Sequence, residues 1–168
     1  MKEIQSLIEI SQFYGNNKAM VIAGGGNTSY KTDDKLWVKA SGFALSTITE
    51  EGFAVMDRKK LDKISENEYS KDSFERERQI KDDLADATIT KDKRPSVETS
   101  FHNAINYKFV IHLHPTLVNG IMCSNKAEEL VPEIFGEEAI YIPYIDPGYI
   151  LFKEVEAKVK KFRGQKGY

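Results

Sequence analysis

The sequence predicts an α/β domain with a mixed sheet covered by helices. Short runs of β-forming residues alternate with longer segments of helical periodicity, and some runs are joined by turns while others are joined by helices. A sheet with both kinds of connection is layered and not purely parallel. The chain has 168 residues, 40% of them hydrophobic, which is enough for one core, so a single domain is expected.

The first half of the chain is predicted to form a helix, a hairpin, and a strand followed by a helix. Apolar residues at helical spacing indicate a helix over residues 3–15. An apolar strand at residues 20–23 runs into a glycine-rich segment, and a strand rich in β-formers follows at 36–40, so the two read as a hairpin. Beyond it we expect a strand at residues 53–56, a short helix at 58–64 and a surface loop at 65–73.

The second half is predicted to be mainly helical. A long charged helix is expected over residues 74–88, and another begins at Pro95, where proline suits the first turn and Ser96 can cap the free amides. This second helix should carry Glu98 and His102 on one face. A strand, a helix, a strand, a turn and a final helix are then expected at residues 109–114, 116–135, 139–144, 146–148 and 149–162.

The composition excludes several classes of function. The chain carries 24 basic and 26 acidic residues and no block of like charge, so no nucleic-acid partner is expected. No apolar run is long enough to span a membrane and Met1 does not begin a signal peptide, which predicts a soluble, cytoplasmic protein. The one cysteine, Cys123, cannot form an internal disulfide, and its apolar neighbours predict a buried structural thiol.

Two histidines near the end of a predicted strand indicate half of a metal site. His112 and His114 are two residues apart, so they share one face of the strand and can bind one ion. Taken alone, the pair can equally be two ordinary polar residues at a strand end, because catalytic zinc usually takes three protein ligands and only two are present here. Glu98, on the preceding helix, can approach the metal and move a proton. His102 fits a third ligand or, as we favour, a side chain that orients Glu98.

Three segments are suited to bind phosphate. Within Gly24–Ser29, glycines let backbone amides approach a ligand, and the polar side chains add donors. The run is neither a Walker loop nor a Rossmann fingerprint, and by itself it reads more simply as a flexible hairpin entrance. Ser41 and Gly42 after the next strand, and Ser96 at a helix start, are two further places that favour anions. Three such places in one small domain favour phosphate binding.

Four segments together resemble the class II aldolase/adducin family in their order and spacing. They are Gly24–Ser29, Lys39–Gly42, Arg94–Glu98 with His102, and His112–Pro115. The sequence around the glycines is most similar to the branch of the family that contains the rhamnulose-1-phosphate and fuculose-1-phosphate aldolases. Members of this branch are often fused to a dehydrogenase. The resemblance implies a three-layer α/β/α fold with a mostly antiparallel sheet, and a homotetramer with active sites between subunits.

The resemblance also implies roles for single residues. By matching position, His112 and His114 are two of three zinc-binding histidines, and Glu98 is the acid and base. His102 matches a histidine that family members often carry without using it as a ligand. The substrate phosphate is held by Gly26, Asn27, Ser41, Gly42 and Ser96. The implied reaction is reversible cleavage of a ketose 1-phosphate, a small sugar phosphate, into dihydroxyacetone phosphate and an aldehyde, with zinc as cofactor.

Two departures from the family pattern limit this expectation. Val97 stands where the family usually has a second serine, so one phosphate-binding hydroxyl is absent. The third zinc histidine belongs to a His-Gly motif after the last helix, and no histidine follows His114. We therefore expect one domain over residues 1–168 that lacks its carboxy-terminal part and binds zinc poorly. The alternatives are a pentulose-phosphate 4-epimerase and an adducin-like domain that only binds or assembles.

Overall fold

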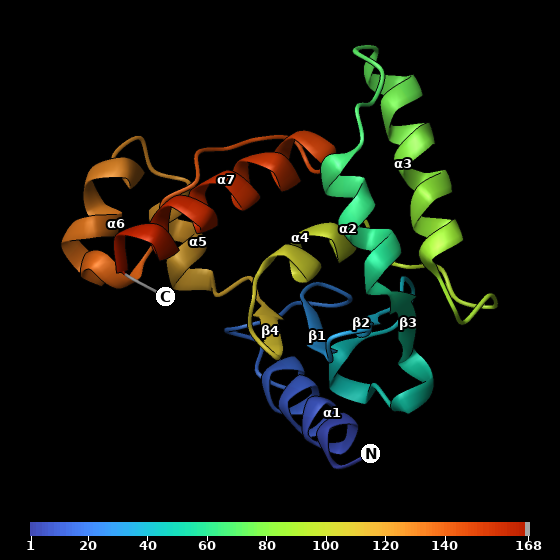
Figure 1. Ribbon diagram of the computed structural model, residues 1–168. Coiled ribbons are helices and arrows are strands. Elements are labelled where there is room, and N and C mark those ends of the chain that lie inside the picture. The colour runs from blue at the N-terminus through green and yellow to red at the C-terminus, as the bar shows by residue number, and fades with distance from the viewer. Residues whose placement is uncertain (167–168) are drawn as a thin grey trace.

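Four antiparallel strands form the central sheet, in the order β3-β2-β1-β4. A computed structural model describes residues 1–166 and has helices on both sides of this sheet (Figure 1). The strands are β1 (Asn27–Lys31), β2 (Lys35–Lys39), β3 (Phe53–Asp57) and β4 (Phe109–His112). The helices are α1 (Lys2–Gly15), η1 (Leu45–Thr47), η2 (Glu50–Gly52), α2 (Arg58–Glu66), α3 (Ser73–Ala87), α4 (Thr99–Ala104), α5 (Thr116–Met122), α6 (Ala127–Phe135), η3 (Gly136–Glu138) and α7 (Tyr149–Lys166). The predicted α/β class with a mostly antiparallel sheet is confirmed.

Two hydrophobic cores on opposite faces of the sheet produce the three layers. Because side chains alternate along a strand, Leu36 and Val38 of β2 face one way and Trp37 faces the other. Leu36 and Val38 are fully buried in a cluster with residues of β3, α2 and α3. Trp37 packs against the second cluster, which contains residues of α1 and Tyr30 of β1. Burying each large apolar side chain contributes about 1.5–3 kcal/mol, so both helical layers are held by the sheet.

The helices α2 and α3 begin where acidic side chains cap them. The Asp57 carboxylate accepts a hydrogen bond from the Lys60 amide at 3.3 Å, and Asp72 accepts from the Glu75 amide at 2.9 Å. Each cap satisfies an amide that has no partner within its helix, which stabilises the helix by about 1 kcal/mol. These caps fix the predicted starts of both helices to within one residue.

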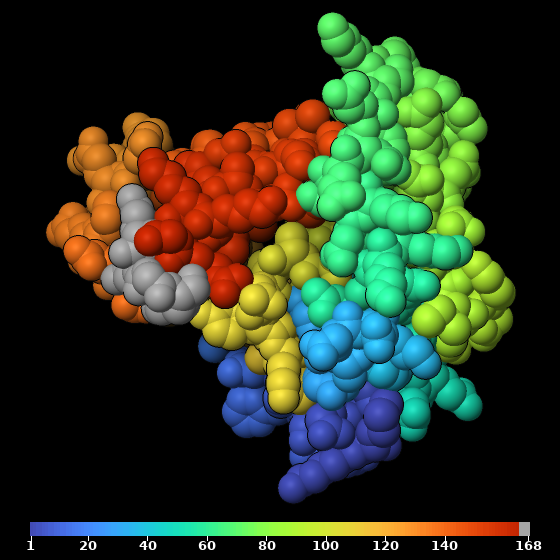
Figure 2. All heavy atoms as spheres, in the orientation of Figure 1, coloured from blue at the N-terminus to red at the C-terminus, as the bar shows by residue number. Residues whose placement is uncertain are grey.

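The last helix, α7, packs against α2, α3 and α4 on the side of the sheet opposite α1 (Figure 1). Its first amide, that of Tyr149, donates to the Glu77 carboxylate of α3 at 3.3 Å. Gly148 has φ +142° and lies so close to Glu77 that an added Cβ would be 2.9 Å from the carboxylate. Further along, Ser65 donates to Glu156, and Figure 2 shows α7 in contact with α2 at the surface. α7 therefore closes the sheet face that carries α4.

The strand predicted at residues 20–23 is wrong, since this segment contains no strand. The first strand is β1, which begins with three polar residues, Asn27, Thr28 and Ser29, from the segment predicted as a glycine-rich entrance. The polar residues of β1 can be buried because their side chains contact polar groups of the helices on the two faces of the sheet. Thr28 lies 2.7 Å from the Ser11 hydroxyl of α1, and the Ser29 hydroxyl lies 2.8 Å from Nδ1 of His102 in α4.

α4 begins later than predicted, at Thr99 rather than near Pro95, and Glu98 is its N-cap residue. Ser96 accounts for the difference, because it forms a tight turn before the helix. Its hydroxyl accepts a hydrogen bond from the Glu98 amide at 3.2 Å, and its carbonyl accepts from the Thr99 amide at 3.1 Å. The His102 amide still donates to the Glu98 carbonyl at 3.1 Å, so one helical turn separates these two residues.

The region around α5 and α6 also differs from the prediction. β4 ends at His112, and the helix predicted over residues 116–135 is divided by a turn in which the Ser124 hydroxyl accepts from the Lys126 amide at 3.2 Å. Residues 139–144 form no strand, and within the described sheet β4 pairs only with β1. The predicted burial of Cys123 is wrong, because this residue ends the exposed helix α5 and is itself exposed. Among residues 1–166, no helix combines the length and the apolarity that crossing a bilayer requires.

Candidate metal centre

The register of the sheet places the candidate residues at one end of β1 and β4. His112 of β4 lies directly across from Asn27 of β1. The loop that leads into α4 brings Glu98 to the same point, and Oε1 of Glu98 lies 3.1 Å from Nδ1 of His112. His114 follows the end of β4, with its ring centroid 4.8 Å from that of His112. The structure therefore brings together Glu98, His112 and His114, as the sequence predicted.

His102 belongs to the same group of side chains. It is fully buried, and its Nδ1 lies 2.8 Å from the Ser29 hydroxyl. Its Nε2 has no hydrogen-bond partner among the described residues. One potential ligand atom from each of Glu98, His102 and His112 lies within 4.8 Å of the other two. His102 is thus close enough to orient Glu98, as we favoured, and also close enough to bind an ion.

The electrostatics of the group favour a charged carboxylate and neutral imidazoles. Burial alone would raise the pKa of Glu98, but the nearby imidazole of His112 and a hydrogen bond from Asn27 outweigh burial and lower the pKa to about 2. Burial lowers the pKa of His102 to about 3, and burial with the neighbouring His112 also lowers the pKa of His114. At neutral pH these three side chains have the protonation states in which they can bind a cation.

The donor set and its unpaired atoms fit a divalent cation such as zinc. Imidazole nitrogens and a carboxylate oxygen are typical zinc ligands. Among residues 1–166, Nδ1 of His112 is buried without a hydrogen bond of good geometry and Nε2 of His102 is buried without a partner. Buried polar atoms without a partner cost free energy, and an ion that accepts their lone pairs would remove that cost.

A cavity of about 420 Å³ opens beside this group. Glu98, His112 and His114 line one side, and Leu151 and Val155 of α7 line another. The remaining walls are mainly apolar and come from α4, β4 and the segment before α7. A concave, largely apolar space with a few convergent polar groups is the usual form of a small-molecule site.

Several of the predicted phosphate-binding residues have structural partners, and Ser41 lines a different cavity from the one beside Glu98 and His112. The Ser41 amide donates to the Arg94 carbonyl at 3.0 Å, which brings Ser41 beside the Ser96 turn. Gly42 has φ +94° and open space around it. Gly26 has φ +73°, and an added Cβ would lie 3.0 Å from the His112 carbonyl oxygen, so close packing on β4 requires a glycine there. Asn27 is buried, and its Oδ1 has no hydrogen-bond partner in the part of the chain that the structure describes.

Sequence reasoning missed the supporting contacts of three polar residues of the sheet, because it assigned Ser29 to phosphate binding and gave Lys31 and Lys39 no role. Ser29 contacts His102. Lys31 is buried and donates to backbone carbonyls at the end of α4. Lys39 is buried and donates to the Phe43 carbonyl at 2.9 Å, which fixes the turn after β2. The available signal was a lysine at the end of each strand, Lys31 in β1 and Lys39 in β2, because a charged residue on a buried strand needs partners.

The fold and the site define a domain of the aldolase type. The chain belongs to the class II aldolase and adducin family, whose N-terminal domain it matches over residues 5–167. It is 32% identical over 164 residues to YuxG of Bacillus subtilis, which is described as an uncharacterized oxidoreductase. The match covers 92% of this chain but only 23% of YuxG.

Two solved structures are also similar to this chain over most of its length. The N-terminal class II aldolase domain of a conserved protein from Thermoplasma acidophilum superimposes with a TM-score of 0.81 at 29% identity, over 92% of this chain and 74% of that one. YgbL of Escherichia coli superimposes with a TM-score of 0.61 at 16% identity, over 94% of this chain and 70% of that one. The second likeness shows the shared fold alone.

Proposed function

We propose that this domain binds zinc and a ketose 1-phosphate and takes part in cleavage of the sugar phosphate to dihydroxyacetone phosphate and an aldehyde. The observation that supports this most directly is the 3.1 Å approach of Glu98 Oε1 to His112 Nδ1 beside a cavity of about 420 Å³. Membership of the class II aldolase and adducin family supports the reaction class. A cytoplasmic location and assembly into a homotetramer belong to the same proposal.

In this proposal, His112 and His114 hold the zinc ion and Glu98 can reach it. A zinc ion bound there would supply Lewis-acid polarisation of the substrate carbonyl. In the condensation direction Glu98 takes a proton from the hydroxymethyl carbon of dihydroxyacetone phosphate, and in the cleavage direction it gives a proton to the same carbon after the carbon–carbon bond has broken. A pKa of about 2 keeps Glu98 ionised, and therefore able to accept a proton, at neutral pH. His102 lies on the buried side of Glu98 with a ring nitrogen within 4.8 Å of the carboxylate, and we propose that it orients Glu98 from there.

The substrate phosphate is proposed to lie at the loops around β1 and β2. Gly42 offers an open turn, and Ser41 lies beside the segment that contains Ser96. The Ser96 hydroxyl accepts from the Glu98 amide and still has its own proton to donate to a phosphate oxygen. Asn27 and the backbone amide near Gly26 complete the set. Holding the phosphate would orient the reacting carbon toward Glu98, which is the positional share of catalysis.

The test is a partial reaction that needs only proton removal. Zinc-loaded protein is mixed with dihydroxyacetone phosphate in deuterated water, and exchange of the carbon-bound proton is followed by NMR. We expect Glu98→Gln to slow the exchange by about 10²–10⁴-fold while zinc content changes little. The control is Glu128→Gln, because Glu128 is an exposed carboxylate of α6.

Two outcomes would contradict the proposal. If the exchange rate and the zinc content of Glu98→Gln fell by the same factor, Glu98 would be a structural metal ligand and not the base. Absence of exchange in the zinc-loaded wild type would argue for a domain that only binds or assembles. A product assay with ketose and pentulose phosphates then separates cleavage, which releases an aldehyde, from epimerisation, which does not.

A further inference from the structure

One face of β1 presents a polar side chain to α4 at every second residue. Side chains two apart on a strand share a face, so Asn27, Ser29 and Lys31 all lie on the α4 side. All three are buried. Asn27 interacts with Glu98, Ser29 contacts the ring of His102, and Lys31 reaches the end of the helix. β1 therefore holds α4 at its start, its middle and its end.

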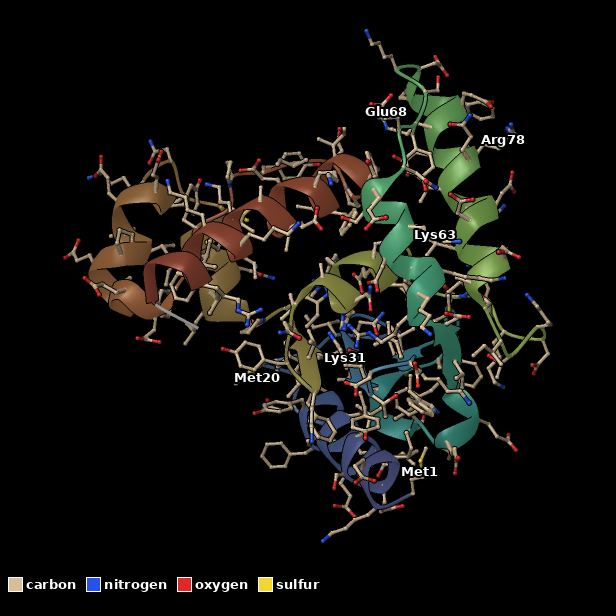
Figure 3. All side chains as sticks on the ribbon, in the orientation of Figure 1. Met1, Met20, Lys31, Lys63, Glu68 and Arg78 are labelled. Carbon is tan, nitrogen blue, oxygen red and sulfur yellow. The ribbon has the colours of Figure 1, made fainter. Side chains whose placement is uncertain are left out.

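Lys31 forms the contact at the end of α4, as the labelled side chain in Figure 3 indicates. Only 4% of Lys31 is exposed. Its ammonium group donates to the carbonyl of His102, to that of Ile105 at 2.5 Å, and to that of Asn103 at 3.3 Å. Carbonyls in the last turn of a helix have no partner within the helix, and a cation there interacts favourably with the helix dipole.

The neighbouring charges do not provide Lys31 with an ion pair. Arg58 of α2 donates to the Asn103 side-chain oxygen at 2.8 Å, and the Asn103 amide donates to Asp62 at 2.7 Å. Asp62 is thus hydrogen-bonded to Asn103, and the ion pairs found within residues 1–166 do not include Lys31. Burial and the nearby Arg58 lower the pKa of Lys31 to about 7. A buried amine whose contacts are backbone carbonyls is costly to desolvate, so its position calls for a role beyond packing.

We propose that Lys31 is a positioning residue for the candidate metal centre. By holding the last turn of α4 against β1, it keeps the His102 ring on Ser29 and a ring nitrogen of His102 within 4.8 Å of the ligand atoms of Glu98 and His112. The inference rests on the proposed metal centre for its function. The geometry of His102 can nevertheless be tested without any metal.

The first test follows the His102 ring nitrogens by NMR in the metal-free protein. The chain has three histidines, so their ring signals can be assigned one by one. In the wild type we expect the ring-nitrogen signals of a single tautomer of His102, fixed by its contact with Ser29. Lys31→Met should shift these signals toward averaged tautomers, and Lys31→Arg, which keeps the cation and its donors, should restore them. Lys35→Met is the control, because Lys35 is exposed.

The second test measures zinc and cobalt affinity in the same proteins. We expect Lys31→Met to weaken metal binding by about 10–100-fold, as loss of a group supporting metal ligands does, and Lys31→Arg to stay close to wild type. If Lys31→Met does not fold, Lys31→Gln replaces it, since glutamine is neutral and still polar. A folded Met or Gln variant with wild-type His102 signals, or with wild-type metal affinity, would overturn the proposal. Absence of metal binding in the wild type would instead count against the metal centre, and the His102 signals would still decide the role of Lys31.

Discussion

Glu98 and His112 meet with 3.1 Å between carboxylate and imidazole although they come from different elements, the start of α4 and the end of β4. The pairing depends on β1, because Asn27 lies across from His112 in the sheet and also interacts with Glu98. Glu98 is therefore held as an anion in a mainly buried position. Most of the testable consequences follow from this arrangement.

Glu98 should make the fold sensitive to acid. Its pKa is lowered from 4.5 to about 2 in the folded protein, so its contribution is fully present above about pH 4.5 and is lost as the pH falls toward 2. The contribution is at most about 3 kcal/mol. Urea unfolding across this range should show a smaller acid loss in Glu98→Gln than in the wild type. An identical acid loss in the two proteins would mean that the carboxylate is not held as described.

Protonation of His102 should begin to destabilise the fold at a higher pH than protonation of Glu98 does. Its pKa falls from 6.5 to about 3 on folding, so the unfolded chain binds the additional proton between these values. Stability is then complete above about pH 6.5 and declines as the pH falls toward 3. Unfolding midpoints measured from pH 7 to 4 should fall less steeply in His102→Gln. A steeper fall in that variant would contradict a neutral buried ring.

Gly26 should tolerate no side chain. With φ +73° and the His112 carbonyl 3.0 Å from an added Cβ, Gly26→Ala would be strained and would push β4 away from β1. We expect a loss of about 1–3 kcal/mol in the free energy of unfolding. Gly24→Ala is the matched control, because a Cβ at Gly24 meets nothing within 4 Å. Equal effects of the two substitutions on thermal unfolding would rule out this explanation.

Hydrophobic patterns predicted most of the scaffold. The run of β-forming residues identifies β2, whose side chains meet a core on each face of the sheet. Helical periodicity identifies α2 and α3, because each buries one face and exposes the other. β1 escaped prediction because its Asn, Thr and Ser residues are buried, and their partners Ser11 and His102 are distant in the sequence. The late start of α4 was hidden for a similar reason, since it depends on hydrogen bonds to Ser96.

The candidate site was more predictable than the contacts that support it. Glu98, His102, His112 and His114 could be selected from their chemistry and spacing, and they do lie together. The sequence favoured His114 as the second metal-binding ring and His102 as a residue that orients Glu98, but it could not show that His102 lies within 4.8 Å of both Glu98 and His112. That closeness depends on how α4 is held against β1, which is set by Ser29 and Lys31 through tertiary contacts.

Zinc affinity of the 168-residue protein, compared with that of His112→Ala, tests the central claim most directly. Both proteins should carry Cys123→Ser, because the exposed thiol of Cys123 is itself able to bind zinc. The account predicts a single zinc site whose affinity falls at least about tenfold when His112 is removed, with parallel measurements on His102→Ala and His114→Ala showing which ring is the second nitrogen ligand. Equal zinc affinity with and without His112, or no zinc binding in either protein, would contradict it.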